Sequence, residues 1–174
     1  AVESREASLL GRKEVLTGKA KFGIFGDGKE VAQIAMAKVF KEGDFRSGYY
    51  RDQTFMFASG MSNVEQFFAQ LYANPDVHAE PSSAGRQMNG HYATRFLDAN
   101  GEWNDLTKTK NCSSDISPTA GQMVRGLGLA FASKLYRKHP ELSKDSKFSN
   151  NGNEVCFTTI GAASTSEGLF WETI

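Results

Sequence analysis

The stretch EVCFTTI-GAASTSEG-LFWETI, residues 154–174, decides the fold that this sequence predicts. Its first seven residues, Glu154 to Ile160, are rich in β-branched and aromatic side chains, which favours a strand. Small residues follow, and then Leu169 to Ile174 has the composition of a helix start. In an open parallel sheet, such a turn lies at the carboxyl end of a strand, where ligands bind and helix N–H groups hold anions. The stretch therefore predicts an α/β fold.

Three segments upstream predict amphipathic helices. Apolar residues at helical spacing define their expected core faces: Val31, Ile34, Ala35 and Val39 in residues 30–41; Val64, Phe67, Phe68 and Leu71 after the capping box of residues 62–65; and Val124, Leu127, Phe131 and Leu135 in residues 119–138. The third segment also contains Gly121, Gly126 and Gly128. Because a glycine costs about 1 kcal/mol inside a helix, three of them indicate that another backbone packs very close.

Length and composition set the class of protein. The chain has 174 residues, enough for one domain, and its 20 basic residues balance 20 acidic ones, which disfavours nucleic acid as a partner. No apolar run approaches the ~18 residues of a membrane helix, and the first 30 residues do not resemble a signal peptide. Two distant cysteines, Cys112 and Cys156, suggest a reducing compartment, so we expect a cytoplasmic protein that does not contact membranes.

One glycine-rich segment has the spacing of a phosphate-binding loop. Residues 23–30 read GIFGDGKE, which fits GxxxxGK, but the next position holds Glu30 where a Ser or Thr hydroxyl should contact Mg²⁺. A carboxylate at that position would repel phosphate. A glycine-rich entry to the helix at residues 30–41 is the favoured interpretation.

Two other segments carry side chains suited to a site, and each has a structural alternative. Residues 49–52 read Tyr-Tyr-Arg-Asp, and the guanidinium of Arg51 with a tyrosine hydroxyl could grip an anion. The alternative is a surface cluster of Arg51 and Asp52. His91 has the titration range of a proton donor, although a lone histidine beside aromatic residues is more often structural.

Taken in order along the chain, five segments together resemble one family. They are Gly28 to Val31 opening a helix, residues 49–52, Gly85 to Tyr92, Ile116-Ser117-Pro118 with Gln122, and Ile160 to Gly168. The family is the alpha subunit, or alpha half, of the thiamine diphosphate-dependent decarboxylating component of 2-oxo acid dehydrogenase complexes. Branched-chain (2-oxoisovalerate) dehydrogenases are the most similar, including bacterial forms in which alpha and beta parts are fused.

The resemblance implies a fold and a set of site residues. The fold is a transketolase-like thiamine diphosphate-binding fold, truncated here: residues 1–174 would be the helix-rich N-terminal part of one domain with the first strand-turn-helix of a parallel sheet. The implied cofactor-binding residues are Tyr50 and Arg51 for the diphosphate, with Ser117, Gly161, Ala162, Ala163 and Ser164. Pro118 and Gln122 match a loop that in some members binds potassium. His91 matches a histidine close to the substrate entrance, and we assign it as catalytic.

The sequence departs from the family at its magnesium motif. The family has an Asp ligand where this chain has Ala162, and the Asn ligand would fall one residue beyond Ile174. Mg²⁺ prefers oxygen ligands, so both of its side-chain ligands are expected to be missing from this chain.

The function implied by the resemblance is that of an oxidoreductase in a multienzyme complex. It would decarboxylate a branched-chain 2-oxo acid with thiamine diphosphate and Mg²⁺, and pass the acyl group to a lipoyl-bearing acyltransferase. A beta subunit or half would complete the site, so the chain is expected to form an oligomer and to be inactive alone. The alternative is a non-catalytic assembly module that has lost metal and cofactor.

Overall fold

The computed structural model describes residues 1–144 and 146–174, which form two compact units. Unit 1 comprises Ala1–Phe40 and Tyr50–Ala93, and unit 2 comprises Lys41–Tyr49 and Thr94–Ile174. No helix among the described residues is long and apolar enough to cross a bilayer.

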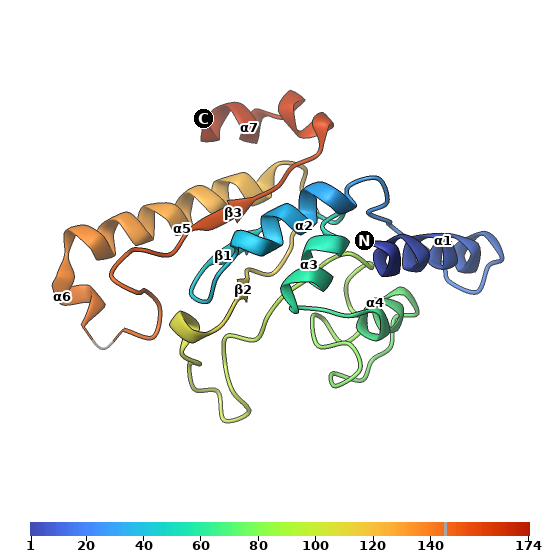
Figure 1. Ribbon diagram of the computed structural model, residues 1–174, viewed down its shortest axis with the longest axis horizontal. Helices are drawn as coiled ribbons and strands as arrows, with labels where there is room; N and C mark the ends of the chain where they lie inside the picture. The colour runs from blue at the N-terminus through green and yellow to red at the C-terminus, as the bar shows by residue number, and fades with distance from the viewer. Residues whose placement is uncertain (145) are drawn as a thin grey trace. The chain divides into compact units, whose positions relative to one another are not determined.

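Within the described residues, unit 1 is built from helices joined by loops (Figure 1). The helices are α1 (Val2–Leu16), α2 (Glu30–Val39), α3 (Gln53–Ser59) and α4 (Val64–Leu71). Helix α2 packs on α3, and α1 packs on both α3 and α4. The sequence predicted α2 and α4, and both are confirmed. The predicted capping box places the cap at Ser62, but the cap of α4 is the next residue, Asn63, whose side chain accepts a hydrogen bond from the Gln66 amide at 2.8 Å.

The buried face of α2 differs from the one that its apolar residues predict. Val31 and Val39 are exposed, whereas Gln33 is buried. The side-chain amide nitrogen of Gln33 donates to the Arg51 backbone carbonyl at 2.8 Å, and the side-chain oxygen of Gln33 accepts from the Phe55 backbone amide at 3.1 Å. The first amides of a helix lack partners within that helix, and Gln33 supplies one to α3. A hydrogen-bonding requirement therefore outweighs hydrophobicity in choosing this face.

Glu30, at the start of α2, ties the preceding glycine-rich loop to α1. Its carboxylate receives two hydrogen bonds from the Arg5 guanidinium, at 2.7 and 3.2 Å, and one from the Gly28 amide at 2.9 Å. The Gly28 amide thus bonds to the Glu30 carboxylate, which agrees with a glycine-rich entry to α2. The Arg5 hydrogen bond is the main cause that lowers the pKa of Glu30 from 4.5 to about 2.

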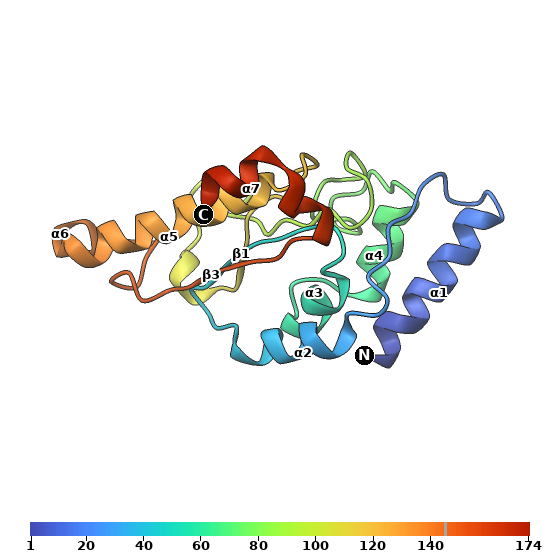
Figure 2. The same ribbon diagram turned by 90° about the horizontal axis from the view of Figure 1, so that it is seen from above.

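Unit 2 contains a three-stranded sheet in the order β2-β1-β3, in which both pairs of strands are parallel. The strands are β1 (Phe45–Ser47), β2 (Asn111–Cys112) and β3 (Cys156–Thr158). Figure 2 shows α5 (Gly121–Lys138) running beside the sheet and α7 (Gly168–Thr173) beside α5. Three short helices complete the described elements: η1 (Leu106–Lys108), α6 (Pro140–Ser143) and η2 (Ala162–Ser166).

The sheet confirms the α/β class and corrects the expected number of strands. The sequence predicted one strand over residues 154–160, and the structure places three of those residues in β3. Strands β1 and β2 were missed because they have three and two residues. Segments this short contain no alternation of polar and apolar residues that could reveal them.

Helix α5 is confirmed, but its buried face is not the predicted one. Leu127 and Phe131 of the apolar stripe are exposed, while Gly121 and Gly126 are buried. A Cβ atom at Gly126 would lie 2.1 Å from the Thr158 hydroxyl oxygen, so only glycine permits this approach to β3. Close packing is thus present at Gly126, but the neighbour is a strand side chain and not the backbone that was predicted. Close packing is absent at Gly128, which has open space around it.

Arg46, in the central strand β1, is a buried cation that joins two segments of unit 2, residues 45–49 and residues 111–115. Its guanidinium forms an ion pair with Asp115 at 2.9 Å, and the two side chains are 1% and 2% exposed. It also donates to the Cys112 sulfur at 3.0 Å and to the Tyr49 carbonyl at 2.9 Å. A buried charge is tolerated only when it is paired and hydrogen-bonded. Arg46 meets both conditions.

We predict that Asp115→Ala lowers the free energy of unfolding by about 3 to 5 kcal/mol, because it leaves the Arg46 charge buried without its counter-ion. Chemical denaturation of both proteins measures the difference. The matched control is Lys108→Ala, which removes an ion pair whose lysine is 79% exposed, and it should cost less than about 1 kcal/mol. A loss for Asp115→Ala no larger than that of the control would contradict the prediction.

We also predict that Glu30 makes unit 1 less stable in acid. Because its pKa is lowered on folding, its ionisation stabilises the folded state above about pH 4.5, and this contribution disappears as the pH falls toward 2. The stability difference between the wild type and Glu30→Gln should therefore shrink across that range. Urea unfolding at several pH values measures it, with Glu65→Gln, an exposed position in α4, as the control. A difference independent of pH would refute this assignment.

Candidate functional site

Tyr50 and Arg51 lie directly before α3 and line a cavity of about 580 Å³ in unit 1. The Arg51 guanidinium stacks over the Tyr50 ring, with its carbon 5.0 Å from the ring centroid. The Arg51 backbone packs closely against Gly26, because a Cβ atom at Gly26 would come within 2.7 Å of the Arg51 carbonyl oxygen. The loop that carries the two side chains is thus held in place while Arg51 itself remains exposed.

A second guanidinium lines the same cavity. Arg12 of α1 forms an ion pair with Asp27 at 2.7 Å and lies over the Phe25 ring at 5.7 Å. The sequence analysis missed Arg12, since no motif surrounds it. Asp27 also lines the cavity, and its charge is offset by Arg12, so the Arg51 guanidinium leaves a net positive charge there. The two guanidiniums and the Tyr50 phenol can offer charge-assisted hydrogen bonds to a phosphate or a carboxylate. The geometry therefore favours an anion as the ligand of this cavity.

The alternative of a surface cluster formed by Arg51 and Asp52 is wrong. Asp52 is fully buried, and its carboxylate accepts a hydrogen bond from the Gln33 side chain at 3.3 Å. Arg51 is exposed and contacts the Tyr50 ring. The two neighbouring residues therefore face different environments.

The segment that carries His91 packs against Tyr50. Gly90 has a φ of +82°, and a Cβ atom there would lie 2.6 Å from the Tyr50 carbonyl oxygen. Gln70 holds the segment from α4, donating to the His91 carbonyl and accepting from the Gly90 amide, both at 2.7 Å. His91 itself is buried, and its Nδ1 lies 3.1 Å from the Met88 carbonyl oxygen. In the neutral ring Nδ1 therefore carries the hydrogen, which makes Nε2 the acceptor.

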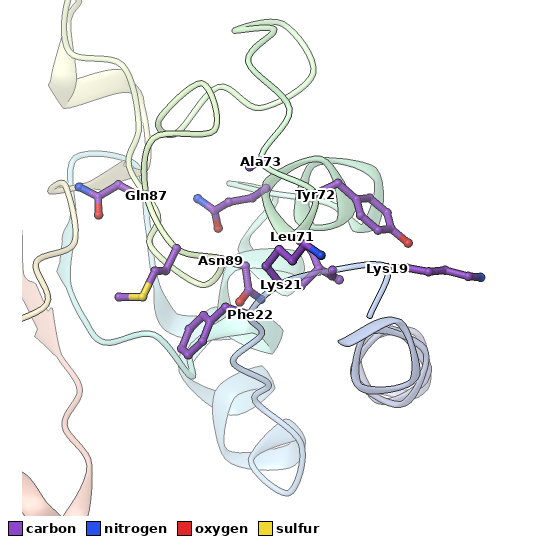
Figure 3. Close-up of a pocket in the computed structure, with 11 residues that line it drawn as sticks. Lys19, Lys21, Phe22, Leu71, Tyr72, Ala73, Gln87 and Asn89 are labelled. Carbon is purple, nitrogen blue, oxygen red and sulfur yellow. The ribbon is translucent and has the colours of Figure 1, made fainter. Parts of the chain in front are cut away.

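A smaller cavity of unit 1, about 180 Å³, lies between residues 19–22, the end of α4 and residues 87–89 (Figure 3). Lys19 and Tyr72 point to the same side in this view, and both bond to the Glu14 carboxylate of α1, at 3.3 and 2.7 Å. Its described lining residues include none of those that the sequence analysis assigned to a site. Lys19 and Tyr72 thus act within the fold, by holding Glu14.

In unit 2, the loop after β3 lies next to the start of α5. The side-chain amide nitrogen of Gln122 donates to the Thr159 backbone carbonyl at 3.0 Å. The backbone carbonyl of Gln122 accepts from the Ser47 hydroxyl at 2.8 Å. Gly161 lies next to Tyr49: a Cβ atom added at Gly161 would lie 3.5 Å from the Tyr49 ring. Ala162, Ala163 and Ser164 continue into η2, where the Ser164 amide donates to the Gly161 carbonyl at 3.0 Å. The structure thus brings Gln122 and the Gly161 loop together at the carboxyl end of β3.

The turn before α5 carries Ser117 and Pro118, which are both exposed. The Pro118 carbonyl accepts from the Gly121 amide at 3.0 Å. Ala120, fully buried, adopts a left-handed conformation with φ of 67°. Such a conformation is costly for a residue other than glycine, so the surrounding packing determines the shape of this turn.

Metal-binding side chains do not gather in the described parts of either unit. Among residues 1–144 and 146–174, no group of three or more His, Cys, Asp or Glu side chains could hold a metal ion. At the loop after β3, Ala162 and Ala163 contribute no side-chain oxygen.

Comparison with known proteins agrees with the motifs. Residues 5–174 match the family described as dehydrogenase E1 component. Over 157 residues the chain is 27% identical to the 2-oxoisovalerate dehydrogenase subunit alpha of Bacillus subtilis (strain 168). This match covers 90% of the chain but 38% of that relative. The chain therefore belongs to the dehydrogenase E1 component family, as its resemblance to the alpha part of 2-oxo acid dehydrogenases predicted.

Proposed function

We propose that this chain is part of the alpha component of a thiamine diphosphate-dependent 2-oxo acid dehydrogenase, with a branched-chain 2-oxo acid as substrate. The observation that carries the proposal is the cavity of unit 1, where Tyr50, Arg51 and Arg12 provide donors for an anion in a chain of this family. The branched-chain preference follows the relative from Bacillus subtilis.

The residues of the unit 1 cavity fit a diphosphate. Its volume of about 580 Å³ lies within the ~300 to 1,000 Å³ of ordinary ligand pockets. The Arg51 fork is exposed beside the Tyr50 ring and can form two parallel bonds to phosphate oxygens. Arg12 already shares one bond with Asp27, so Arg51 is the stronger candidate for the principal contact.

The proposal assigns roles to other residues by family resemblance. Ser117, Gly161, Ala162, Ala163 and Ser164 would contact the cofactor, and Pro118 with Gln122 would line a potassium site. When bound, thiamine diphosphate supplies carbanion stabilisation after loss of carbon dioxide. His91 would act as the catalytic residue through Nε2, the ring nitrogen that does not face Met88. Residues 1–174 would form the N-terminal part of one transketolase-like domain.

The described side chains do not fit Mg²⁺, because Ala162 and Ala163 offer no side-chain oxygen in the loop after β3. Ala162 is the specific observation that favours a second candidate, an assembly module that has lost metal and cofactor. In the first candidate, a beta subunit and a lipoyl-bearing acyltransferase are the partners within a cytoplasmic complex. Cofactor binding distinguishes the two candidates, since a module without a cofactor has no need of a diphosphate clamp.

We predict that Arg51→Lys weakens thiamine diphosphate binding by the complex with its beta partner about tenfold to hundredfold. Lysine keeps the charge but cannot form two parallel hydrogen bonds, and one lost charge-assisted bond costs about 1.5 to 3 kcal/mol. Calorimetric titration measures the affinity. Arg95→Lys, at another exposed arginine, is the control and should bind as the wild type does. Equal affinities for Arg51→Lys and the wild type would remove Arg51 from the site.

We further predict that residues 1–174 alone do not decarboxylate branched-chain 2-oxo acids with thiamine diphosphate and Mg²⁺. The family completes its site with a beta part, and this chain lacks side-chain oxygens at Ala162. Carbon dioxide release above the background of the cofactor alone would argue against this incomplete site.

A further inference from the structure

Unit 2 contains a separate cavity of about 250 Å³ at the amino-terminal ends of its strands. Phe45 is the first residue of β1, and Glu154 lies two residues before β3. Tyr136 of α5 forms another side of the cavity. None of its described lining residues is among those that the family resemblance assigns. We call this space the aromatic cavity.

Aromatic rings dominate its wall. They are Phe45, Phe96, Trp103, Tyr136 and Phe148. Trp103 and Phe148 pack edge to face with ring centroids 5.0 Å apart, and Phe45 and Phe96 do so at 6.1 Å. These perpendicular pairs restrain the rings, whose faces carry negative electrostatic potential. Phe45 is buried, whereas Trp103 is 47% and Phe148 38% exposed, so the cavity is open to solvent on one side.

Glu154 adds a negative charge to the aromatic wall. Its carboxylate accepts from the Ser149 hydroxyl at 2.8 Å and from the Asn150 amide at 3.0 Å. Burial opposes ionisation of Glu154, but these bonds and one from Ser133 outweigh it and lower the pKa. Among the lining residues that the structure describes, Glu154 alone has a formal charge at neutral pH. The nearby Lys147 ammonium donates to the Trp103 carbonyl at 2.7 Å and is not part of this wall.

This combination selects for one class of ligand. A neutral apolar molecule would leave the hydrogen-bonded carboxylate without a counter-charge in the cavity, and an anion would be repelled by it. A metal ion needs several oxygen ligands, and this wall offers one carboxylate. A quaternary ammonium carries its charge under apolar methyl groups, which is the type of ligand that aromatic cages hold by cation–π attraction. We propose that the aromatic cavity binds a small organic cation of the methylated ammonium class.

The test uses choline and its neutral carbon isostere, in which a tert-butyl group replaces the trimethylammonium group. The chain contains two tryptophans, and Trp171 lies in α7 outside the cavity, so Trp171→Phe leaves Trp103 as the fluorescent reporter. In this background, choline should change the Trp103 emission in a saturable way, and the isostere should bind at least about tenfold more weakly. Absence of a saturable response to choline, or equal affinity for both compounds, overturns the proposal.

Two variants separate charge from shape. Glu154→Gln removes the charge at constant volume and should weaken choline binding about threefold to thirtyfold. Glu141→Gln, in the short helix α6, is the matched control and should bind choline as the parent does. Because Glu154 also bonds within the fold, Phe148→Leu provides a second variant that removes one ring at the exposed side and should also weaken binding. Unchanged choline affinity in a folded Glu154→Gln or Phe148→Leu protein overturns the proposal.

Discussion

The buried guanidinium of Arg46 is the constraint on which unit 2 depends. It lies in the central strand and bonds to the Tyr49 carbonyl of its own segment, and to the Cys112 sulfur and the Asp115 carboxylate of the segment that contains β2. The Arg46 side chain is 1% exposed, so its charge must keep its counter-ion. These segments therefore cannot separate without exposing the Arg46 charge or leaving it buried without Asp115. The pairing of β1 with β2 and the course of the chain at Tyr49 follow from this one requirement.

Close approach at Gly126 is the second constraint. Helix α5 turns Gly126 toward β3, because a Cβ atom there would collide with the Thr158 side chain. This packing also brings Gln122 to the Thr159 carbonyl, directly before the Gly161 loop. Its cost is the exposure of Leu127 and Phe131 on the opposite face. The arrangement of the loop after β3 thus depends on a glycine that permits close packing and on the side-chain hydrogen bond of Gln122.

The candidate anion site contains one arginine that a sequence motif predicted and one that no motif predicted. Arg51 was predicted from its neighbours and from family resemblance, and the structure places it with Tyr50 at a cavity of unit 1. Arg12 was not predicted, because it lies in a helix that the sequence analysis did not identify, far from Arg51 along the chain. Its role depends on folding, which brings α1 to the same cavity. Residues with a motif can be recognised in the sequence, whereas a residue that reaches a site from a distant helix cannot.

The sequence by itself determined the family, the α/β class and the helices α2, α4 and α5, because these depend on local periodicity, capping residues and ordered motifs. The burial of Phe67 and Leu71 in α4 agrees with its predicted face, whereas tertiary structure alone decided which face of α2 and of α5 is buried. Gln33 is buried in place of Val31 because the α3 amide at Phe55 needs an acceptor, and Gly126 is buried in place of Phe131 because β3 lies too close for a side chain. It also decided the strands β1 and β2, whose two or three residues become strands only when backbone partners lie beside them. Hydrogen-bonding needs and steric limits arise from neighbours distant in sequence, and hydrophobic periodicity contains no information about them.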